Sequence, residues 1–233
     1  MLFIAKLCFF IFLGLLVFVS VIDPNIGWDS CLTKDEPLAI TSCYEDKANE
    51  GDVTSQYKSA ERYLGADGVD VDEIKAVYWF RKAANNGHLD AQRRLGNAYS
   101  LGVGIKKDIK LAEYWWVRSA KAGHIPTQLI LGEKYYEGDV LTKNHKKSAH
   151  WYLRAAIQGD QDAQAIIGSF YSVGKGVPKD MILACAWLDV ASKKGDPELI
   201  EERDRYARKL SQNERAISFD LSTKWKKGNA ITR

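Results

Sequence analysis

Residues 91–124 read AQRRLGNAYSLGVGIKKDIKLAEYWWVRSAKAGH and contain one complete copy of a pattern that recurs every 36 residues along the chain. Helix-breaking glycines mark the step between copies, and glutamine, tyrosine and tryptophan keep the same phase. Agreement of residue identity and spacing over four copies predicts a repeat architecture. The aligned columns are Gly51, Gly87, Gly123, Gly159 and Gly195; Gln56, Gln92, Gln128 and Gln164; Tyr63, Tyr99, Tyr135 and Tyr171; and Trp79, Trp115, Trp151 and Trp187.

Each copy is predicted to form two helices joined by a turn. Asp108 can cap a helix in which Ala112 and Trp115 follow at helical spacing, and Gly123 ends that helix. A further helix is expected over about residues 126–137, and a glycine-rich turn joins the two helices within a copy. One such hairpin cannot bury both of its faces, so neighbouring hairpins must stack.

The repeated motif resembles that of the Sel1-like repeat family, which is related to the tetratricopeptide repeats. The resemblance covers residues 52–195 and implies an all-α fold: a right-handed superhelical α/α solenoid of four 36-residue helical hairpins. It also implies scaffold and adaptor roles in protein binding. The motif residues are Ala91, Leu95, Gly96, Tyr99, Gly102 and Gly104, then Asp108, Ala112 and Trp115, then Ala120, Gly123 and His124.

Both ends of the repeat array are expected to be capped. Residues 196–233 leave the 36-residue period, and Ser211-x-x-Glu214 predicts a capping box in a C-terminal capping helix pair. Residues 23–51 are expected to form an irregular N-terminal cap. Cys31 and Cys43 lie twelve residues apart in this cap, and in an oxidising compartment we expect them to form a disulfide.

Residues 1–22 form a hydrophobic segment with one charge, Lys6, before the apolar run 7–22. The run is intermediate in length between a signal-peptide core and a full membrane span. Two interpretations stay open: an uncleaved N-terminal hydrophobic helix that anchors the chain in the membrane, or a signal peptide that is removed. Both predict an exported protein, located in the periplasm or on the inner membrane facing the periplasm.

Composition and motifs argue against several other functions. The net charge of +3 comes from interspersed acids and bases, so we expect no nucleic-acid partner. His145 and His150 are spaced poorly for one helix face, and the acidic run 67–73 lacks calcium-loop spacing. The Gly-x-Gly turns have no preceding strand, as a phosphate loop would require. We therefore expect no metal, no cofactor and no catalytic residues.

The repeat columns separate an expected core from an expected binding face. The four tyrosines and four tryptophans listed above are predicted to form the structural core of the repeats. The variable positions on the first helix of each hairpin are expected to line a concave groove that binds a partner, although a plain solvated face is the alternative. The predicted groove residues are Arg94, Asn97, Ile130, Glu133, Lys134, Ile166 and Phe170.

Three functions fit this sequence. The most specific is an immunity protein that neutralises a secreted antibacterial effector of lipase type, because small exported Sel1-like proteins resemble such proteins. The second is an envelope scaffold or adaptor that regulates a membrane or periplasmic complex. A Sel1-like hydrolase is the third, but those enzymes usually carry two cysteines per repeat, whereas this chain has only Cys185 in its four repeats.

Overall fold

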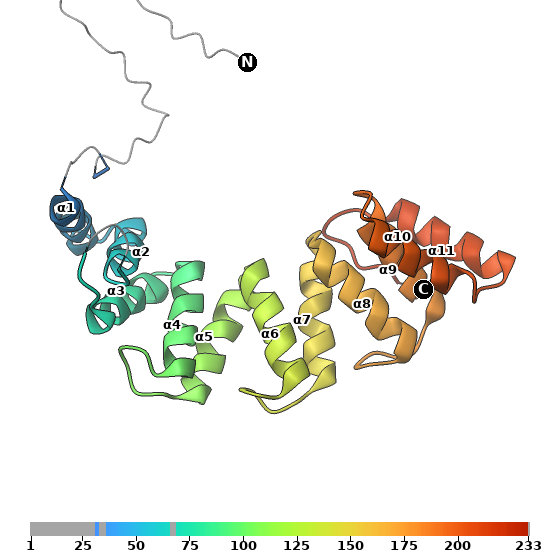
Figure 1. Cartoon of the computed structure of the whole chain (residues 1–233), viewed down its shortest axis with the longest axis horizontal. Coiled ribbons are helices and arrows are strands. Elements are labelled where there is room, and N and C mark those ends of the chain that lie inside the picture. Colours follow the sequence, from blue (N-terminus) through green and yellow to red (C-terminus); the bar gives the residue numbers. More distant parts are fainter. Residues whose placement is uncertain (1–30, 33–35, 66–68, 233) are drawn as a thin grey trace, which may run out of the picture.

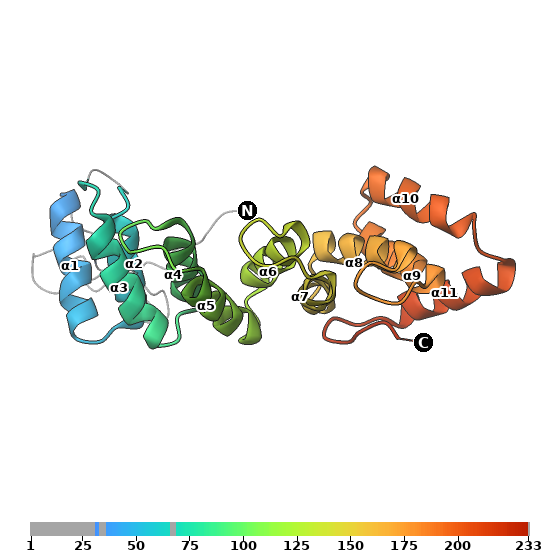
Figure 2. The same cartoon turned by 90° about the horizontal axis from the view of Figure 1, so that it is seen from below.

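The computed structural model describes residues 31–32, 36–65 and 69–232, and all regular elements within these ranges are α-helices (Figure 1). The helices form a curved row in which α1 to α9 each pack on the next helix along the chain, and α10 and α11 both pack on α9 (Figure 1 and Figure 2). This arrangement confirms the predicted all-α solenoid. They are α1 (Pro37–Asn49), α2 (Val53–Arg62), α3 (Glu73–Asn85), α4 (Leu89–Leu101), α5 (Ile109–Lys121), α6 (Ile125–Glu137), α7 (His145–Ile157), α8 (Gln161–Val173), α9 (Met181–Ser192), α10 (Pro197–Ala207) and α11 (Gln212–Lys224).

The four hairpins are α2–α3, α4–α5, α6–α7 and α8–α9, with α1 at one end and α10–α11 at the other (Figure 1). The predicted hydrophobic segment 1–22 lies outside the described residues. Within the described ranges, none of the helices has the length and apolar character needed to cross a membrane.

The expectation of an irregular N-terminal cap is wrong for its last part, because residues 37–49 form α1. Pro37 stands in the first turn, where its missing N–H costs no hydrogen bond, and Tyr44 and Ala48 are buried. This helix was not predicted because its sequence shows only weak amphipathic periodicity. Cys43 of α1 forms the predicted disulfide with Cys31.

Side-chain caps fix where the second helix of each hairpin begins. In each case the cap side chain accepts a hydrogen bond from the backbone N–H three residues later. The backbone N–H of the same cap donates to the carbonyl of the repeat tyrosine nine residues earlier, at 2.8–2.9 Å. This pairing closes the turn within every hairpin. The caps are Asp72, Asp108, Asn144 and Asp180.

The glutamine column links each hairpin to the preceding helix. Each side-chain amide is buried and donates to a carbonyl in the last turn of that helix, where backbone acceptors lack helical partners. The same bond therefore occurs at four successive junctions. The pairs are Gln56 to Ala48 (3.1 Å), Gln92 to Ala84 (3.0 Å), Gln128 to Ala120 (2.9 Å) and Gln164 to Ala156 (3.1 Å).

The tryptophan column lies in the core, where Trp79, Trp115, Trp151 and Trp187 are all buried. The tyrosine column is less uniform. Tyr99 and Tyr135 are buried, whereas Tyr63 and Tyr171 are half-buried and pack against the core clusters. The aromatic columns thus join successive hairpins into continuous hydrophobic clusters.

Candidate protein-binding surface

The predicted groove residues occupy two kinds of environment along the first helices. Ile130 and Ile166 are half-buried and pack against the hydrophobic clusters. Lys134 pairs with Glu133 and with Asp139, each at 3.3 Å. Along α6 and α8 these positions therefore make local contacts within the fold.

Phe170 is a wrong prediction, because its side chain is 5% exposed and cannot line a groove. Its ring stacks on Tyr136 at 5.7 Å between centroids and meets Tyr152 edge-on at 5.8 Å. The positions equivalent to Phe170 in the first two repeats, Arg62 and Ala98, are also buried. This column varies because each member meets a different neighbour within the fold.

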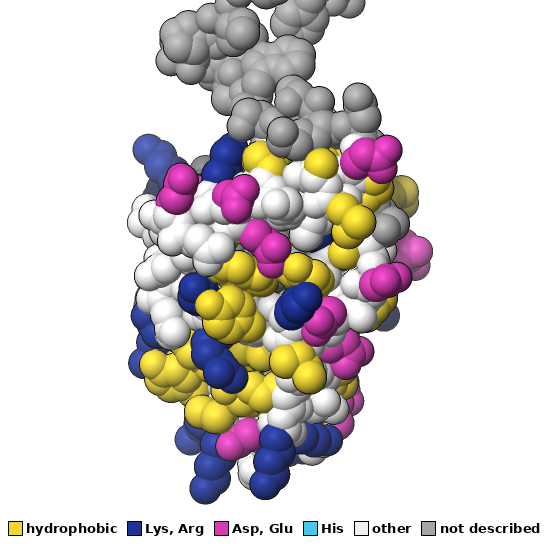
Figure 3. Space-filling model, turned by 90° about the vertical axis from the view of Figure 1, so that its left-hand side faces the viewer, with side chains coloured by type: hydrophobic (Ala, Val, Ile, Leu, Met, Phe, Trp, Pro, Cys, Tyr) yellow, Lys and Arg dark blue, Asp and Glu magenta, His cyan; other side chains and the backbone are white. Residues whose placement is uncertain are grey.

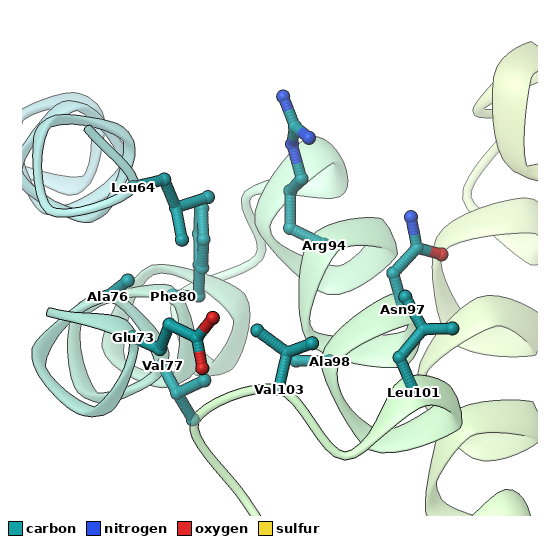
Figure 4. Close-up of a pocket in the computed structure, with 10 residues that line it drawn as sticks. All are labelled: Leu64, Glu73, Ala76, Val77, Phe80, Arg94, Asn97, Ala98, Leu101 and Val103. Carbon is teal, nitrogen blue, oxygen red and sulfur yellow. The ribbon is translucent and has the colours of Figure 1, made fainter. Parts of the chain in front are cut away.

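Arg94 and Asn97 lie together on α4, at the edge of a pocket between α3 and α4 (Figure 4). We call it the repeat-two pocket, and its volume is about 180 Å³. Seven of its ten lining side chains are apolar. They are Leu64, Ala76, Val77, Phe80, Ala98, Leu101 and Val103, and the polar members are Glu73, Arg94 and Asn97.

Short-range contacts hold the two polar side chains of α4 in place. The Arg94 guanidinium forms an ion pair with Glu61 of the preceding hairpin at 3.1 Å. Asn97 accepts a hydrogen bond from the Trp116 indole N–H at 3.0 Å, which ties its side chain to α5. The pocket therefore has a rim of preorganised polar groups and an apolar interior.

Exposed apolar side chains lie in the amino-terminal part of the solenoid, between α1 and α4. Hydrophobic atoms gather on the end face that carries α1, with basic side chains among them (Figure 3). Leu64 and Leu101, at the mouth of the repeat-two pocket, are 40% and 71% exposed. Apolar surface of this kind, rimmed by polar groups, is typical of protein interaction sites. Other exposed apolar residues in this part of the chain are Leu38, Val71, Ile74 and Tyr78.

A second cavity of about 300 Å³ lies in the C-terminal cap, next to Cys185. Three of its charged lining residues pair with one another, since Arg203 contacts Asp189 at 3.4 Å and Asp204 at 2.7 Å. Burial raises the pKa of the Cys185 thiol, which favours the unreactive protonated form. Among the described residues, no cluster of three or more His, Cys, Asp or Glu side chains is suited to a metal ion.

The repeats match a known family in sequence as well as in geometry. The profile of the Sel1 repeat matches residues 53–88, 89–124, 126–160 and 161–196, which together exceed half of the chain. The chain belongs to the Sel1 repeat family. The resemblance inferred from the motif is thereby confirmed, and the Sel1 units coincide with the four hairpins of the solenoid.

Solved structures of other Sel1 repeat proteins share the fold. A protective antigen with an SLR fold from uropathogenic Escherichia coli is 32% identical, with 82% of this chain and 41% of that chain covered, at a TM-score of 0.65. A Sel1 repeat protein from Oxalobacter formigenes is 28% identical, with 76% and 50% covered, at 0.62. This Sel1 chain thus spans about half the length of these relatives or less.

An immunity protein from Pseudomonas aeruginosa is a much more distant match. It is 16% identical, with 83% of this chain and 76% of that chain covered, and its TM-score of 0.40 is too low to carry an argument. Among curated proteins, none matches this Sel1 chain in sequence.

Sequence reasoning found two residues of the repeat-two pocket and missed its apolar interior. Arg94 and Asn97 were predicted from their variable columns. Ala98 belongs to the same helix face, but a small side chain gives no sign of a pocket until its neighbours are known. The sequence feature that could have indicated the pocket is the difference in side-chain size within one repeat column. This column holds arginine, alanine, lysine and phenylalanine at positions 62, 98, 134 and 170.

Proposed function

We propose that this chain is an exported, non-catalytic protein-binding solenoid that neutralises a secreted antibacterial effector, of lipase type, by gripping it at the repeat-two pocket. The observation that carries the proposal is the pocket itself. It combines apolar walls with the fixed side chains of Arg94 and Asn97, and Leu101 stands exposed at its mouth.

Family membership and the amino-terminal segment support the two other parts of the proposal. Sel1 repeats imply a protein partner, and stacked hairpins offer an extended surface for one. The apolar run 7–22 would bring the solenoid to the compartment where such an effector acts. An exported binding protein there could occlude the effector's catalytic cleft without any catalytic group of its own.

The test is growth rescue in a bacterial host that produces, one at a time, exported toxins encoded beside the gene for this chain. We expect the full chain to restore growth against one of them, and a chain that lacks residues 1–22 to give no protection. Failure against every neighbouring toxin, together with recovery of an envelope complex on the purified chain, would replace the immunity role with the scaffold role.

A matched pair of variants tests whether the pocket is the contact surface. Leu101 and Val173 occupy the same repeat position and are 71% and 64% exposed, and Glu137 stands at that position in the third repeat. Glutamate is thus compatible with the fold there. We expect Leu101→Glu to weaken binding of the toxin about tenfold or more, as loss of an interface anchor does, and Val173→Glu to bind as the wild type. Equal binding by both variants would exclude the pocket.

A further inference from the structure

The residues that line the repeat-two pocket have equivalents two repeats later, at residue numbers higher by 72. These equivalents lie at the junction between α7 and α8. Three positions are informative because their side chains differ in size. Leu64 corresponds to Tyr136, Phe80 to Tyr152, and Ala98 to Phe170. Equivalent repeat positions therefore line both helix junctions, but with side chains of different size.

At the second of these places, the space is filled by an aromatic ring of the chain itself. Phe170 is buried between the rings of Tyr136 and Tyr152, stacked on the first and edge-on to the second. Lys175 covers the Tyr136 ring at 4.5 Å and donates a hydrogen bond to its hydroxyl at 2.8 Å. This junction shows how an aromatic side chain fits between a second helix and the following first helix.

At the repeat-two pocket, the equivalent ring is absent. Ala98 ends at its Cβ, and Leu64 is smaller than the tyrosine that it replaces, so space remains in front of the buried Phe80 (Figure 4). An apolar cavity of about 150 Å³ is large enough to hold a benzene ring. The repeat-two pocket, at about 180 Å³, has room for one ring and opens to solvent beside Leu101.

We propose that the repeat-two pocket receives an aromatic side chain presented by the protein partner, in the place that Phe170 takes at the equivalent junction. The inference rests on the proposed function in that it names the anchor by which the partner is held. Phe80 already contacts the Tyr57 ring at 5.7 Å between centroids, and Tyr57 stacks on His88 at 4.3 Å. A ring that enters the pocket extends this aromatic cluster, which favours an aromatic over an aliphatic side chain.

The experiment uses the full chain in detergent micelles and two small probes, N-acetyl-4-fluorophenylalaninamide and N-acetylleucinamide, followed by ¹⁹F and ¹H NMR. We expect the aromatic probe to bind about fivefold more tightly than the aliphatic one. Ala98→Phe should abolish binding and raise the melting temperature, because the new ring fills the pocket. Ala98→Ser, which leaves the space open, should bind the aromatic probe as the wild type does.

A second test asks whether the equivalent junction between α7 and α8 can be made to bind the aromatic probe. Phe170→Ala opens the α7–α8 junction, and a folded Phe170→Ala chain should bind two aromatic probes instead of one. The inference is overturned if the probes bind equally, if Ala98→Phe binds like the wild type, or if Ala98→Phe is less stable than the wild type, which would show that the ring does not fit. Probe binding without growth rescue would refute the immunity role alone, and growth rescue without probe binding would refute the aromatic anchor alone.

Discussion

His88 caps α4 with a ring nitrogen, where most caps in this chain use a carboxylate oxygen. Its Nδ1 accepts a hydrogen bond from the backbone N–H of Ala91 at 3.3 Å, and its ring stacks on Tyr57. The bond requires a neutral Nδ1, because a protonated imidazole nitrogen cannot accept. Burial lowers the pKa of His88, against the opposing influence of the Asp90 and Glu61 carboxylates. Protonation of the His88 ring is therefore expected to remove the hydrogen bond that caps the start of α4.

We predict that the chain loses stability as the pH falls below about 6.5, the ordinary pKa of histidine in an unfolded chain. In that range the unfolded state binds more protons than the folded state, so protonation favours unfolding until the lower folded pKa is passed. His88→Asn keeps an acceptor at the cap but does not titrate. Urea unfolding at pH 7.5 and 5.5 should show a smaller difference for His88→Asn than for the wild type.

Part of the pH dependence should survive in this variant, because burial also lowers the pKa values of His124 and His150. An unchanged difference between the two pH values in His88→Asn would show that the cap is insensitive to protonation.

At the scale of whole helices, the first helix approaches the second through a glycine in three of the four hairpins, and the first hairpin has Ala60 at this position. Gly96, Gly132 and Gly168 occupy one repeat column in α4, α6 and α8. A Cβ built on Gly96 would lie 2.4 Å from the Trp116 ring, on Gly132 it would lie 2.9 Å from the Tyr152 ring, and on Gly168 it would lie 3.1 Å from the nearest atoms. The absence of a side chain lets a large side chain of the next helix fit closely.

We predict that alanine at these positions destabilises the fold in the order of these distances. Overpacking in Gly96→Ala should cost about 1–3 kcal/mol of unfolding free energy, and the gain of about 1 kcal/mol in helix propensity leaves a net loss of about 0–2 kcal/mol. Gly132→Ala should cost less, and Gly168→Ala least. Chemical unfolding of the three variants measures the series. A stabilised Gly96→Ala chain would mean that Trp116 shifts freely and that the close approach is unimportant.

The helices of the repeats and of the C-terminal cap could be predicted well from the sequence, because their ends are encoded locally, whereas α1 was not predicted. Asp108 and Ser211-x-x-Glu214 act as the caps that the pattern indicated. The contents of the junctions could not be predicted in this way. Whether a variable residue such as Phe170 faces solvent or a neighbouring helix depends on side chains in another repeat. The repeat-two pocket was missed for the same reason, since it arises from Ala98 and Leu64 together.

At the scale of the whole molecule, each hairpin contacts mainly its neighbours in sequence. Stability in such a stack is approximately the sum of local terms, so the ends can open without the middle. At the amino-terminal end, α1 packs mainly on α2 and also accepts, through Glu45, a hydrogen bond from the Trp79 indole N–H of α3 at 3.3 Å. Arg62 bonds to Thr41 at 2.8 Å and to the Pro37 carbonyl at 3.1 Å, and the Cys31–Cys43 disulfide is the only covalent cross-link among the described residues.

We predict that replacing both disulfide cysteines with serine loosens this end and leaves the rest of the stack intact. A bridge that closes a loop of about 15 residues is worth roughly 3 kcal/mol in the chain-entropy model. In the Cys31→Ser, Cys43→Ser variant, hydrogen exchange should therefore accelerate in α1, whereas α6 and α7 keep the wild-type rate. Uniform acceleration over all helices would show that the solenoid opens as one unit.

The glutamine bond that joins each hairpin to the preceding helix has a consequence for the ancestry of the chain. Because the same donor and acceptor meet at four successive junctions, an in-frame duplication or loss of one hairpin creates no interface of a new kind. Length is thus the property that descendants of such a gene can alter with the least disturbance. The choice of binding partner, in contrast, can change through a single substitution at a helix junction that holds a small residue such as Ala98.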